Sequence, residues 1–390
     1  MIHFNNTKIA FQSKTKKELK KASFLFKMLK YPWLVKTGKG LTYFAIQTRL
    51  PINWIIKPTI YSHFCGGETI QECNPTVEKI GKYNVRSILD YSVEGKENPE
   101  DMKAALDETM QTIENAAQNP NIPFAVFKPT AFGKSSVLIK ASAGEQLREK
   151  DEKELEAFRS RIESLAQKAY EKDVPILIDA EDHCYQHIID QVVTEMMEKY
   201  NKEKAIVFNT LQMYRWDRLN FLKEALKKAE EGNYYLGMKY VRGAYMEKER
   251  ERARKMGYPS PIQPDKESTD RDYDAALKFS VEHIDKISIF NGTHNEKSSL
   301  YLTELMEKHN IPKNDARIYF SQLYGMSDHI SFNLANEGYN VAKYVPYGPV
   351  KNVLPYLIRR AEENTSVAGQ TNRELALLKN EIQRRKKYSE

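Results

Sequence analysis

From Val85 to Tyr344 the sequence alternates short apolar runs with longer charged segments of helical character, and this rhythm constrains the fold more than any other feature. Such runs are typical of strands in a parallel sheet, because helices cover both faces of that sheet. Eight runs occur: VRSIL, FAVF, ILI, AIVF, YLGM, ISIF, RIYF and NVAKY. Eight strands close a TIM-type barrel, so the sequence predicts an α/β protein with a (β/α)8 barrel.

Nearly every run ends in a polar or charged residue, and in such barrels the active site forms from residues at the carboxyl ends of the strands. A single aspartate there could equally be a helix cap. The polar and apolar residues expected at the barrel mouth are Glu94, Lys128, Asp179, Asn209, Gln212, Lys239, Arg242, Tyr245, Thr293, His294, Leu323 and Tyr344. Cations outnumber anions among them, so we expect the site to prefer a negatively charged ligand.

The segment after the eighth run, Leu354 to Asn364, is predicted to form a helix over the barrel mouth, with Pro355 in its first turn. Two stripes at helical spacing lie on opposite faces. The apolar stripe consists of Leu354, Leu357, Ile358 and Ala361, and the polar stripe of Tyr356, Arg359, Arg360 and Glu363. This pattern fits an ordinary surface helix, but two adjacent guanidinium groups also suit bidentate binding of a carboxylate.

With 390 residues, of which 41% are hydrophobic, the chain is long enough for one large α/β domain with an appendage. We expect residues 1–83 to form an N-terminal helical arm, and residues 84–390 to form the catalytic barrel with a C-terminal helical tail. The formal charge of +7 is mild for this length, and it suits anionic ligands or membrane lipid about as well as nucleic acid.

The arm interleaves aromatic and aliphatic residues with lysines from Phe24 to Ile56. We expect it to pack on the barrel, and the alternative is a contact with a membrane surface. The three cysteines form no CxxC pair and no disulfide framework, which favours a reducing compartment. No secretory signal and no apolar stretch of about twenty residues occurs, so we expect a cytoplasmic protein that is open to peripheral attachment at the inner membrane.

A metal site is the alternative interpretation of one short segment, because Asp179, Glu181, His183 and His187 fall close together. The two histidines are one helical turn apart, as zinc ligands often are. They lie in the helix after the third strand, whereas Asp179 lies at the strand end, so we expect no metal here. The sequence also has no GxGxxG or Walker-type phosphate loop and no Cys/His pair placed for covalent chemistry.

Seven motifs occur in order along the body of the chain, and together they resemble the proline dehydrogenases. These are FAD-dependent barrel enzymes that oxidise L-proline to Δ1-pyrroline-5-carboxylate and pass electrons to quinone. The motifs are FKPTAFG from Phe127, LIDAED from Leu177, VFNTLQMY from Val207, KYVRGAYMEKER from Lys239, GTHN from Gly292, QLYGM from Gln322 and YLIRRAEEN from Tyr356. The resemblance starts near Tyr61 and implies that FAD, L-proline and quinone are the ligands, with no nucleic acid.

For the substrate, the resemblance implies that Arg359, Arg360 and Lys128 hold the proline carboxylate. Tyr344, Tyr356 and Leu323 would form a wall around the ring of the substrate. Asp179 would neutralise and orient the cations, and Glu94 would pair with Arg359. The catalytic residues implied are Asp179, Lys239 and Arg242.

For the cofactor, the resemblance implies an FAD site formed by Ala180, Asn209, Gln212, Lys239, Arg242, Gly243, Ala244, Thr293, His294 and Glu363. Bacterial bifunctional relatives usually have arginine and then lysine where this chain has Lys239 and then Arg242, and glutamine in place of Asn209. The individual roles at the two cationic positions therefore stay open. The chain has no room for an aldehyde dehydrogenase half, so we expect a monofunctional enzyme.

Three alternatives remain. The first is a hydroxyproline dehydrogenase of the same family, which Tyr344 disfavours because a ring hydroxyl would have to share its space. The second is a metal-dependent barrel hydrolase using Asp179, Glu181 and His187. The third is a basic protein that binds nucleic acid or anionic lipid, which would show binding that depends steeply on salt.

Overall fold

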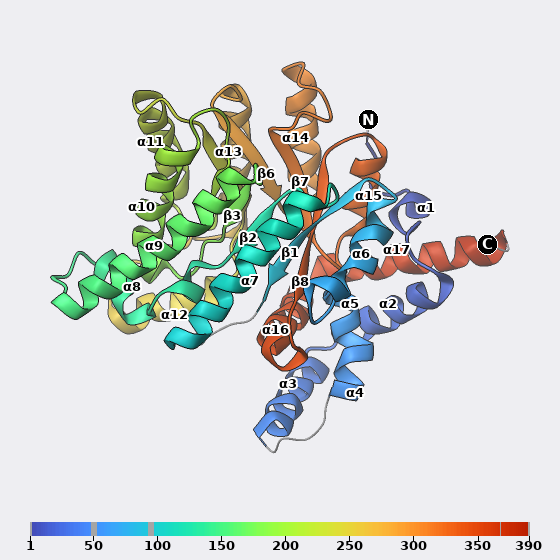
Figure 1. Cartoon of the computed structure of the whole chain (residues 1–390). Coiled ribbons are helices and arrows are strands. Elements are labelled where there is room, and N and C mark those ends of the chain that lie inside the picture. Colours follow the sequence, from blue (N-terminus) through green and yellow to red (C-terminus); the bar gives the residue numbers. More distant parts are fainter. Residues whose placement is uncertain (1, 48–52, 93–96, 367, 389–390) are drawn as a thin grey trace. The chain divides into compact units, whose positions relative to one another are not determined.

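The computed structural model describes residues 2–47, 53–92, 97–366 and 368–388, and Figure 1 shows the course of the chain. Each of the eight predicted apolar runs forms a strand. The strands are β1 (Val85–Tyr91), β2 (Ala125–Phe127), β3 (Ile176–Ile178), β4 (Val207–Gln212), β5 (Leu236–Val241), β6 (Ile287–Gly292), β7 (Ile318–Leu323) and β8 (Val341–Tyr347). They form one parallel sheet in the order β1-β8-β7-β6-β5-β4-β3-β2, which confirms the predicted (β/α)8 architecture.

Helices follow the strands along the chain. Before β1 lie α1 (Thr7–Ala10), α2 (Lys16–Leu29), α3 (Pro32–Gln47), α4 (Asn53–Ile56), a π-helical turn η1 (Lys57–Tyr61), α5 (Ser62–Phe64) and α6 (Ile70–Gly81). Between β1 and β5 lie α7 (Pro99–Gln118), η2 (Pro129–Phe132), α8 (Ser135–Ser142), α9 (Glu149–Glu171), α10 (His183–Tyr200) and α11 (Arg218–Glu231). After β5 lie α12 (Met246–Met256), α13 (Lys266–Glu282), α14 (Glu296–Lys308), α15 (Asp328–Asn336), α16 (Val350–Ser366) and α17 (Ala368–Lys387).

The chain forms two compact units, one of residues 95–321 and the other of residues 1–94 together with 322–390. In the first unit, α7, α10 and α13 pack against β2, β4 and β6 (Figure 1). The aromatic side chain of Phe124, just before β2, lies edge-on to Phe208, Phe290 and Tyr319. Phe124, Phe208 and Phe290 are buried and Tyr319 is half-buried, so this cluster forms part of the core of the unit.

In the second unit, β1 pairs with β8 over its whole length, from Val85 with Val341 to Tyr91 with Tyr347. The C-terminal helix α17 packs against α1 and α2, and the shared core includes Phe11, Leu19, Phe26, Leu375 and Leu378. Arg385 of α17 also donates hydrogen bonds to the carbonyls of Phe11 and Lys14. The basic end of this helix therefore anchors the N-terminal segment.

Helix α16 begins earlier than the sequence suggests, so the prediction that Pro355 lies in its first turn is wrong. The carbonyl of Pro349 accepts hydrogen bonds from the amides of Asn352 and Val353, which starts the helix before Pro355 is reached. Val350 and Val353 are buried and anchor this first turn. Pro355 lies inside the helix.

The sequence-based division at residue 83 does not coincide with the two compact units, and it stays a prediction, as does the position of α16 over the barrel mouth. Residues 2–47 and 53–83 are mainly helical, as expected for the arm. Among the described residues, no helix is long and apolar enough to cross a membrane.

Candidate active site

Three charged side chains from three neighbouring strand ends meet in the unit of residues 95–321. Asp179, directly after β3, accepts a hydrogen bond from Lys239 of β5 at 2.6 Å through Oδ1. Its other oxygen, Oδ2, lies 3.4 Å from the ammonium nitrogen of Lys128, which follows β2. Lys239 is buried, while Lys128 and Asp179 are half-buried. The sequence prediction that these three residues meet is consistent with this geometry.

The cluster keeps Asp179 ionised. Burial alone would raise the pKa of the Asp179 carboxyl, but the positive charges of Lys239 and Lys128 outweigh burial and hold that pKa below its ordinary value. Two cations thus share one carboxylate. A cluster that contains two cations suits an anionic ligand at this end of the strands.

Strand alternation separates the predicted residues of β4. Gln212 donates to the backbone carbonyl of Glu181, beside the charged cluster, at 3.1 Å. Asn209 lies three residues earlier and therefore on the opposite face of the strand. Its amide donates to Asp190 of α10 at 3.0 Å. Asn209 thus binds the surrounding helix layer, and its expected contact with a cofactor stays a prediction.

The loop from Arg242 to Tyr245 leads from β5 into α12. Arg242 donates to Asp270 and to Thr293 Oγ1, each at 2.7 Å, and to Ser298 at 3.0 Å, and its guanidinium lies 4.3 Å from the centre of the Tyr273 ring. The arginine is held from four sides. It fixes the start of the loop against β6 and the helices beside it.

Gly243 is required at its position in this loop. Its φ is +121°, and a Cβ there would lie 2.6 Å from ring carbons of Tyr214. The exposed backbone of Gly243 and Ala244, followed by the N-terminus of α12, suits an anionic group such as a pyrophosphate. Thr293 and the half-buried His294 follow β6, and Ala180 follows Asp179. This donor set fits a flavin dinucleotide.

The remaining predicted residues belong to the other unit. On α16, Arg360 is only 8% exposed, and its guanidinium lies 5.2 Å from the centre of the Tyr356 ring. Tyr356 is buried in a core formed with residues such as Leu29, Tyr61 and Leu357. The interpretation of this segment as an ordinary surface helix is therefore wrong, because Tyr356 and Arg360 of its polar stripe are buried.

Tyr344 of β8 is buried, and Leu323 at the end of β7 and Arg359 of α16 are half-buried. Glu94 and the side chain of Glu363 lie outside the described residues, so the predictions for them stay untested. Tyr245, also expected at the mouth, is the residue directly before α12.

Three of the four residues of the alternative metal site, Asp179, Glu181 and His187, make other contacts. Both carboxylate oxygens of Glu181 accept hydrogen bonds from Thr130, and Asp179 binds the two lysines. His187 is exposed and contacts Gln191. Among the described residues, no three His, Cys, Asp or Glu side chains are grouped as a metal ion would require.

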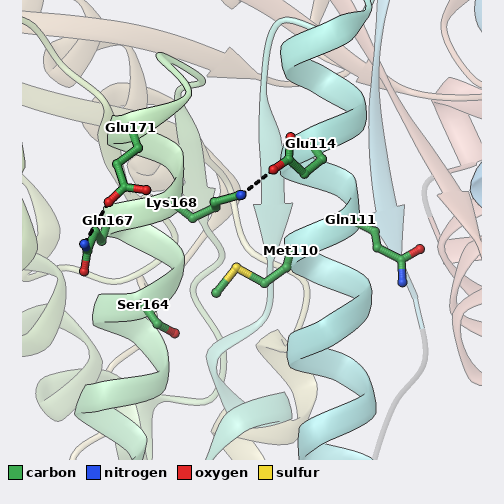
Figure 2. Close-up of a pocket in the computed structure, with 7 residues that line it drawn as sticks. All are labelled: Met110, Gln111, Glu114, Ser164, Gln167, Lys168 and Glu171. Atoms are coloured by element: carbon green, nitrogen blue, oxygen red, sulfur yellow. Dashed lines mark hydrogen bonds and ion pairs between the residues drawn. The ribbon is translucent and has the colours of Figure 1, made fainter.

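A groove lies on the outer side of the first unit, between α7 and α9 (Figure 2). Lys168 of α9 forms an ion pair with Glu114 of α7 across it. Its lining residues are Met110, Gln111, Glu114, Ser164, Gln167, Lys168 and Glu171. None of them was predicted for the site.

A parallel eight-stranded barrel with charged side chains gathered at the carboxyl ends of its strands defines a barrel enzyme. The family model described as proline dehydrogenase matches residues 73–373, so the chain belongs to the proline dehydrogenase family. The resemblance inferred from the seven motifs is thereby confirmed.

Proline dehydrogenase 1, mitochondrial, of Dictyostelium discoideum is 35% identical over 379 residues, which cover 86% of this chain and 66% of that protein. Hydroxyproline dehydrogenase of Xenopus laevis is 30% identical over 414 residues, which cover 96% of this chain and 88% of that protein. The crystal structure of proline utilization A (PutA) from Bdellovibrio bacteriovorus, inactivated by N-propargylglycine, matches with a TM-score of 0.73 and 21% identity. That match covers 92% of this chain and 38% of PutA, and at this identity it shows the fold alone.

Proposed function

We propose that this protein oxidises L-proline to Δ1-pyrroline-5-carboxylate, with FAD as the hydride acceptor and quinone as the final electron acceptor. The observation that carries the proposal is the Lys128–Asp179–Lys239 cluster at the strand ends of a barrel of this family. In the reaction, a hydride leaves the ring carbon next to nitrogen, the nitrogen loses its proton, and a carbon–nitrogen double bond forms. FAD, when bound, takes up the hydride.

The chain's own residues supply position and charge. Lys128, Arg359 and Arg360 are proposed to bind the carboxylate of proline, with Tyr344, Tyr356 and Leu323 beside its ring. Burial of Arg360 against Tyr356 supports this role, because a partly desolvated guanidinium binds carboxylate more strongly than a solvated one. Glu94 is proposed to pair with Arg359.

For FAD, we propose that Gln212, Lys239, Ala180 and the loop of Arg242, Gly243 and Ala244 form the site, with Thr293, His294 and Glu363. The strongest support is the fixed geometry of the loop. Arg242 is held by Asp270 and Thr293. Gly243 has a positive φ, and both Gly243 and Ala244 are exposed. Asn209 has the weakest support, because its amide binds Asp190.

The purified protein is expected to be yellow, and anaerobic addition of L-proline is expected to bleach its flavin absorption. The bleaching follows because hydride transfer reduces the flavin when no electron acceptor is present. 4-Hydroxyproline serves as the comparison substrate, since a hydroxyproline dehydrogenase is among the relatives. If the protein binds FAD but only 4-hydroxyproline bleaches the flavin, the substrate is hydroxyproline and not proline. A colourless protein that cannot be reconstituted with FAD would exclude both.

Transfer of electrons to quinone requires access to a membrane, and the N-terminal region has a surface suited to that contact. Between Lys14 and Lys57 the sequence has eleven lysines and arginines and one acidic residue, Glu18, whereas the whole chain carries only +7. Phe24 of α2, Trp33 of α3 and Trp54 of α4 are 66%, 64% and 73% exposed. Cations with exposed aromatic rings are typical of proteins bound at the surface of an anionic bilayer.

We expect the protein to bind vesicles containing phosphatidylglycerol and to bind pure phosphatidylcholine vesicles much more weakly. Replacing Phe24, Trp33 and Trp54 together by serine should lower vesicle binding in co-sedimentation by about tenfold or more, because their apolar area no longer enters the interface. The control is Trp216→Ser, which removes another exposed tryptophan, in the other unit. Equal vesicle binding by the triple variant and by the wild type would show that these three side chains do not form the membrane contact.

A further inference from the structure

Glu181 is a buried carboxylate that the proposed reaction does not use. It lies two residues after Asp179, in the segment that joins β3 to α10. Burial raises the pKa of the Glu181 carboxyl to about 7, although its hydrogen bonds from Thr130 act in the opposite direction. A buried carboxyl is costly unless its partners compensate for lost water, so its contacts indicate what it does.

The side chain of Glu181 binds Thr130 twice. Oε2 accepts from the backbone amide of Thr130 at 2.8 Å, and Oε1 accepts from the Thr130 hydroxyl at 2.7 Å. Thr130 lies in the short helical turn η2, and Lys128 is the residue directly before that turn. Since Pro129 has no amide hydrogen, the amide of Thr130 is the first donor of the turn. Glu181 thus fixes the turn that directs Lys128.

The backbone of Glu181 is held as firmly as its side chain. Gln186 accepts from the Glu181 amide at 2.9 Å, and Gln212 donates to the Glu181 carbonyl at 3.1 Å. Gln186 in turn donates to Asp190 at 3.0 Å, and Asp190 forms a buried ion pair with Arg218 at 2.6 Å. The segment after β3 is therefore held in place by hydrogen bonds, and the side chain of Glu181 ties the turn after β2 to this segment.

We propose that Glu181 is a positioning residue that sets the distance between Lys128 and Asp179 by holding the turn of Thr130. The proposal rests on the proposed function, in which Lys128 binds the carboxylate of proline. Glu181 acts through Thr130 and does not itself contact the substrate. Its effect should therefore fall on substrate binding and leave flavin binding, which uses Gln212 and the loop of Arg242, unchanged.

The two substitutions Glu181→Ala and Glu181→Gln separate this role from a role of charge. Alanine removes both contacts with Thr130. Glutamine keeps both, because its oxygen accepts from the Thr130 amide and its NH2 group donates to the Thr130 hydroxyl, which can also accept. We expect E181A to raise KM for L-proline by about tenfold or more, with kcat and FAD content close to wild type, since lost uniform binding appears in KM. E181Q should stay within about threefold of wild type in KM.

Two results would overturn the proposal. One is a KM for E181A within about twofold of wild type, with only the melting temperature lowered, which would make Glu181 a fold-stabilising residue alone. The other is an equal rise in KM for E181Q and E181A, which would show that Glu181 acts through its charge and not through its contacts with Thr130. Thr130→Val, which removes the hydroxyl and keeps the amide, provides a milder variant if E181A does not fold, and it should raise KM by a smaller factor.

A crystal structure of E181A gives a readout that needs no activity. We expect Lys128 Nζ to move away from Asp179 Oδ2, a distance of 3.4 Å in the present structure, while the Lys239–Asp179 pair stays at 2.6 Å. An unchanged Lys128–Asp179 distance would refute the positioning role. If the wild-type protein does not oxidise proline, the proposed function fails, but this structural comparison still tests Glu181.

Discussion

Asp179→Asn is expected to lower kcat/KM for L-proline by about 100-fold or more. Asp179 uses one oxygen for Lys239 and the other for Lys128, at 2.6 and 3.4 Å. Asparagine keeps one oxygen but replaces the other with an NH2 group, which can only donate. One of the two cations then faces a donor in a partly buried site. That cation is then no longer held in place for the substrate, and misplacing a positioning group in an active site costs about 100-fold, which corresponds to about 2.7 kcal/mol of lost transition-state stabilisation.

The measurement for Asp179→Asn is steady-state proline oxidation with an artificial electron acceptor, together with FAD content and the visible spectrum. A suitable control is Asp173→Asn, the same change at an exposed position before β3. Asp173 has a φ of +56°, where asparagine is well tolerated, and its partner Lys204 is exposed. D173N should match the wild type. Activity of D179N within threefold of the wild type would show that the charge cluster has no part in the reaction.

The fold could be predicted because its signal is repeated eight times. Each apolar run is too short to distinguish a strand from a buried helix, but eight runs in alternation with helical segments leave few architectures. The boundaries were less accurate. β4, β5 and β8 continue past Asn209, Lys239 and Tyr344, because these side chains are buried and need not end a strand. The early start of α16 depends on the backbone at Pro349, which apolar spacing does not reveal.

The site could be predicted only in part, because the sequence does not say which side of a strand a polar residue faces. Asn209 and Asn291 end apolar runs as Lys239 does, yet they contact Asp190 of α10 and Tyr273 of α13. The side chain of Lys239 lies on the opposite face of the sheet from those of Asn209 and Asn291, and it binds Asp179. A polar residue at the end of a run therefore either joins the site or fixes a helix, and the register decides between these two roles.

Thr130, Gln186 and Asp190 were missed by the sequence analysis for a similar reason. Thr130 and Gln186 form hydrogen bonds with Glu181, and Asp190 forms one with Asn209. In each pair the two residues come from different segments of the chain, so the sequence does not show that they meet. The position of Thr130 two residues after Lys128 was the available signal. This spacing alone does not show that Thr130 binds the carboxylate of Glu181.

The second large effect is expected for stability, at Asp328→Asn. In the unit of residues 1–94 and 322–390, Asp328 at the start of α15 binds Lys343 of β8 at 2.8 Å and Lys14 at 3.0 Å. Lys343 is only 1% exposed. Asparagine removes the negative charge that both ammonium groups share, and its NH2 group faces one of them as a second donor. We expect the free energy of unfolding to fall by about 3–5 kcal/mol, measured by urea unfolding at pH 7.

Two companion variants test that cause. Asp285→Asn changes an aspartate that is 98% exposed and 3.7 Å from Arg317, and it should cost less than about 1 kcal/mol. Adding Lys343→Met to D328N removes the unpaired cation, so the double variant should be more stable than D328N alone. Equal stability of D328N and the exposed control would contradict the ion-pair explanation.

The contribution of Asp328 to the free energy of unfolding is expected to depend on pH. Burial alone would raise the pKa of Asp328, but Lys14 and Lys343 outweigh burial and hold that pKa far below its ordinary value. A carboxyl whose pKa is lower in the folded state stabilises the fold fully above the pKa of the unfolded chain, about 4, and loses that contribution as the pH falls further. The stability difference between wild type and D328N should therefore be largest near neutral pH and shrink below pH of about 4. A difference that grows on acidification would mean that Asp328 is not held as an anion by these two lysines.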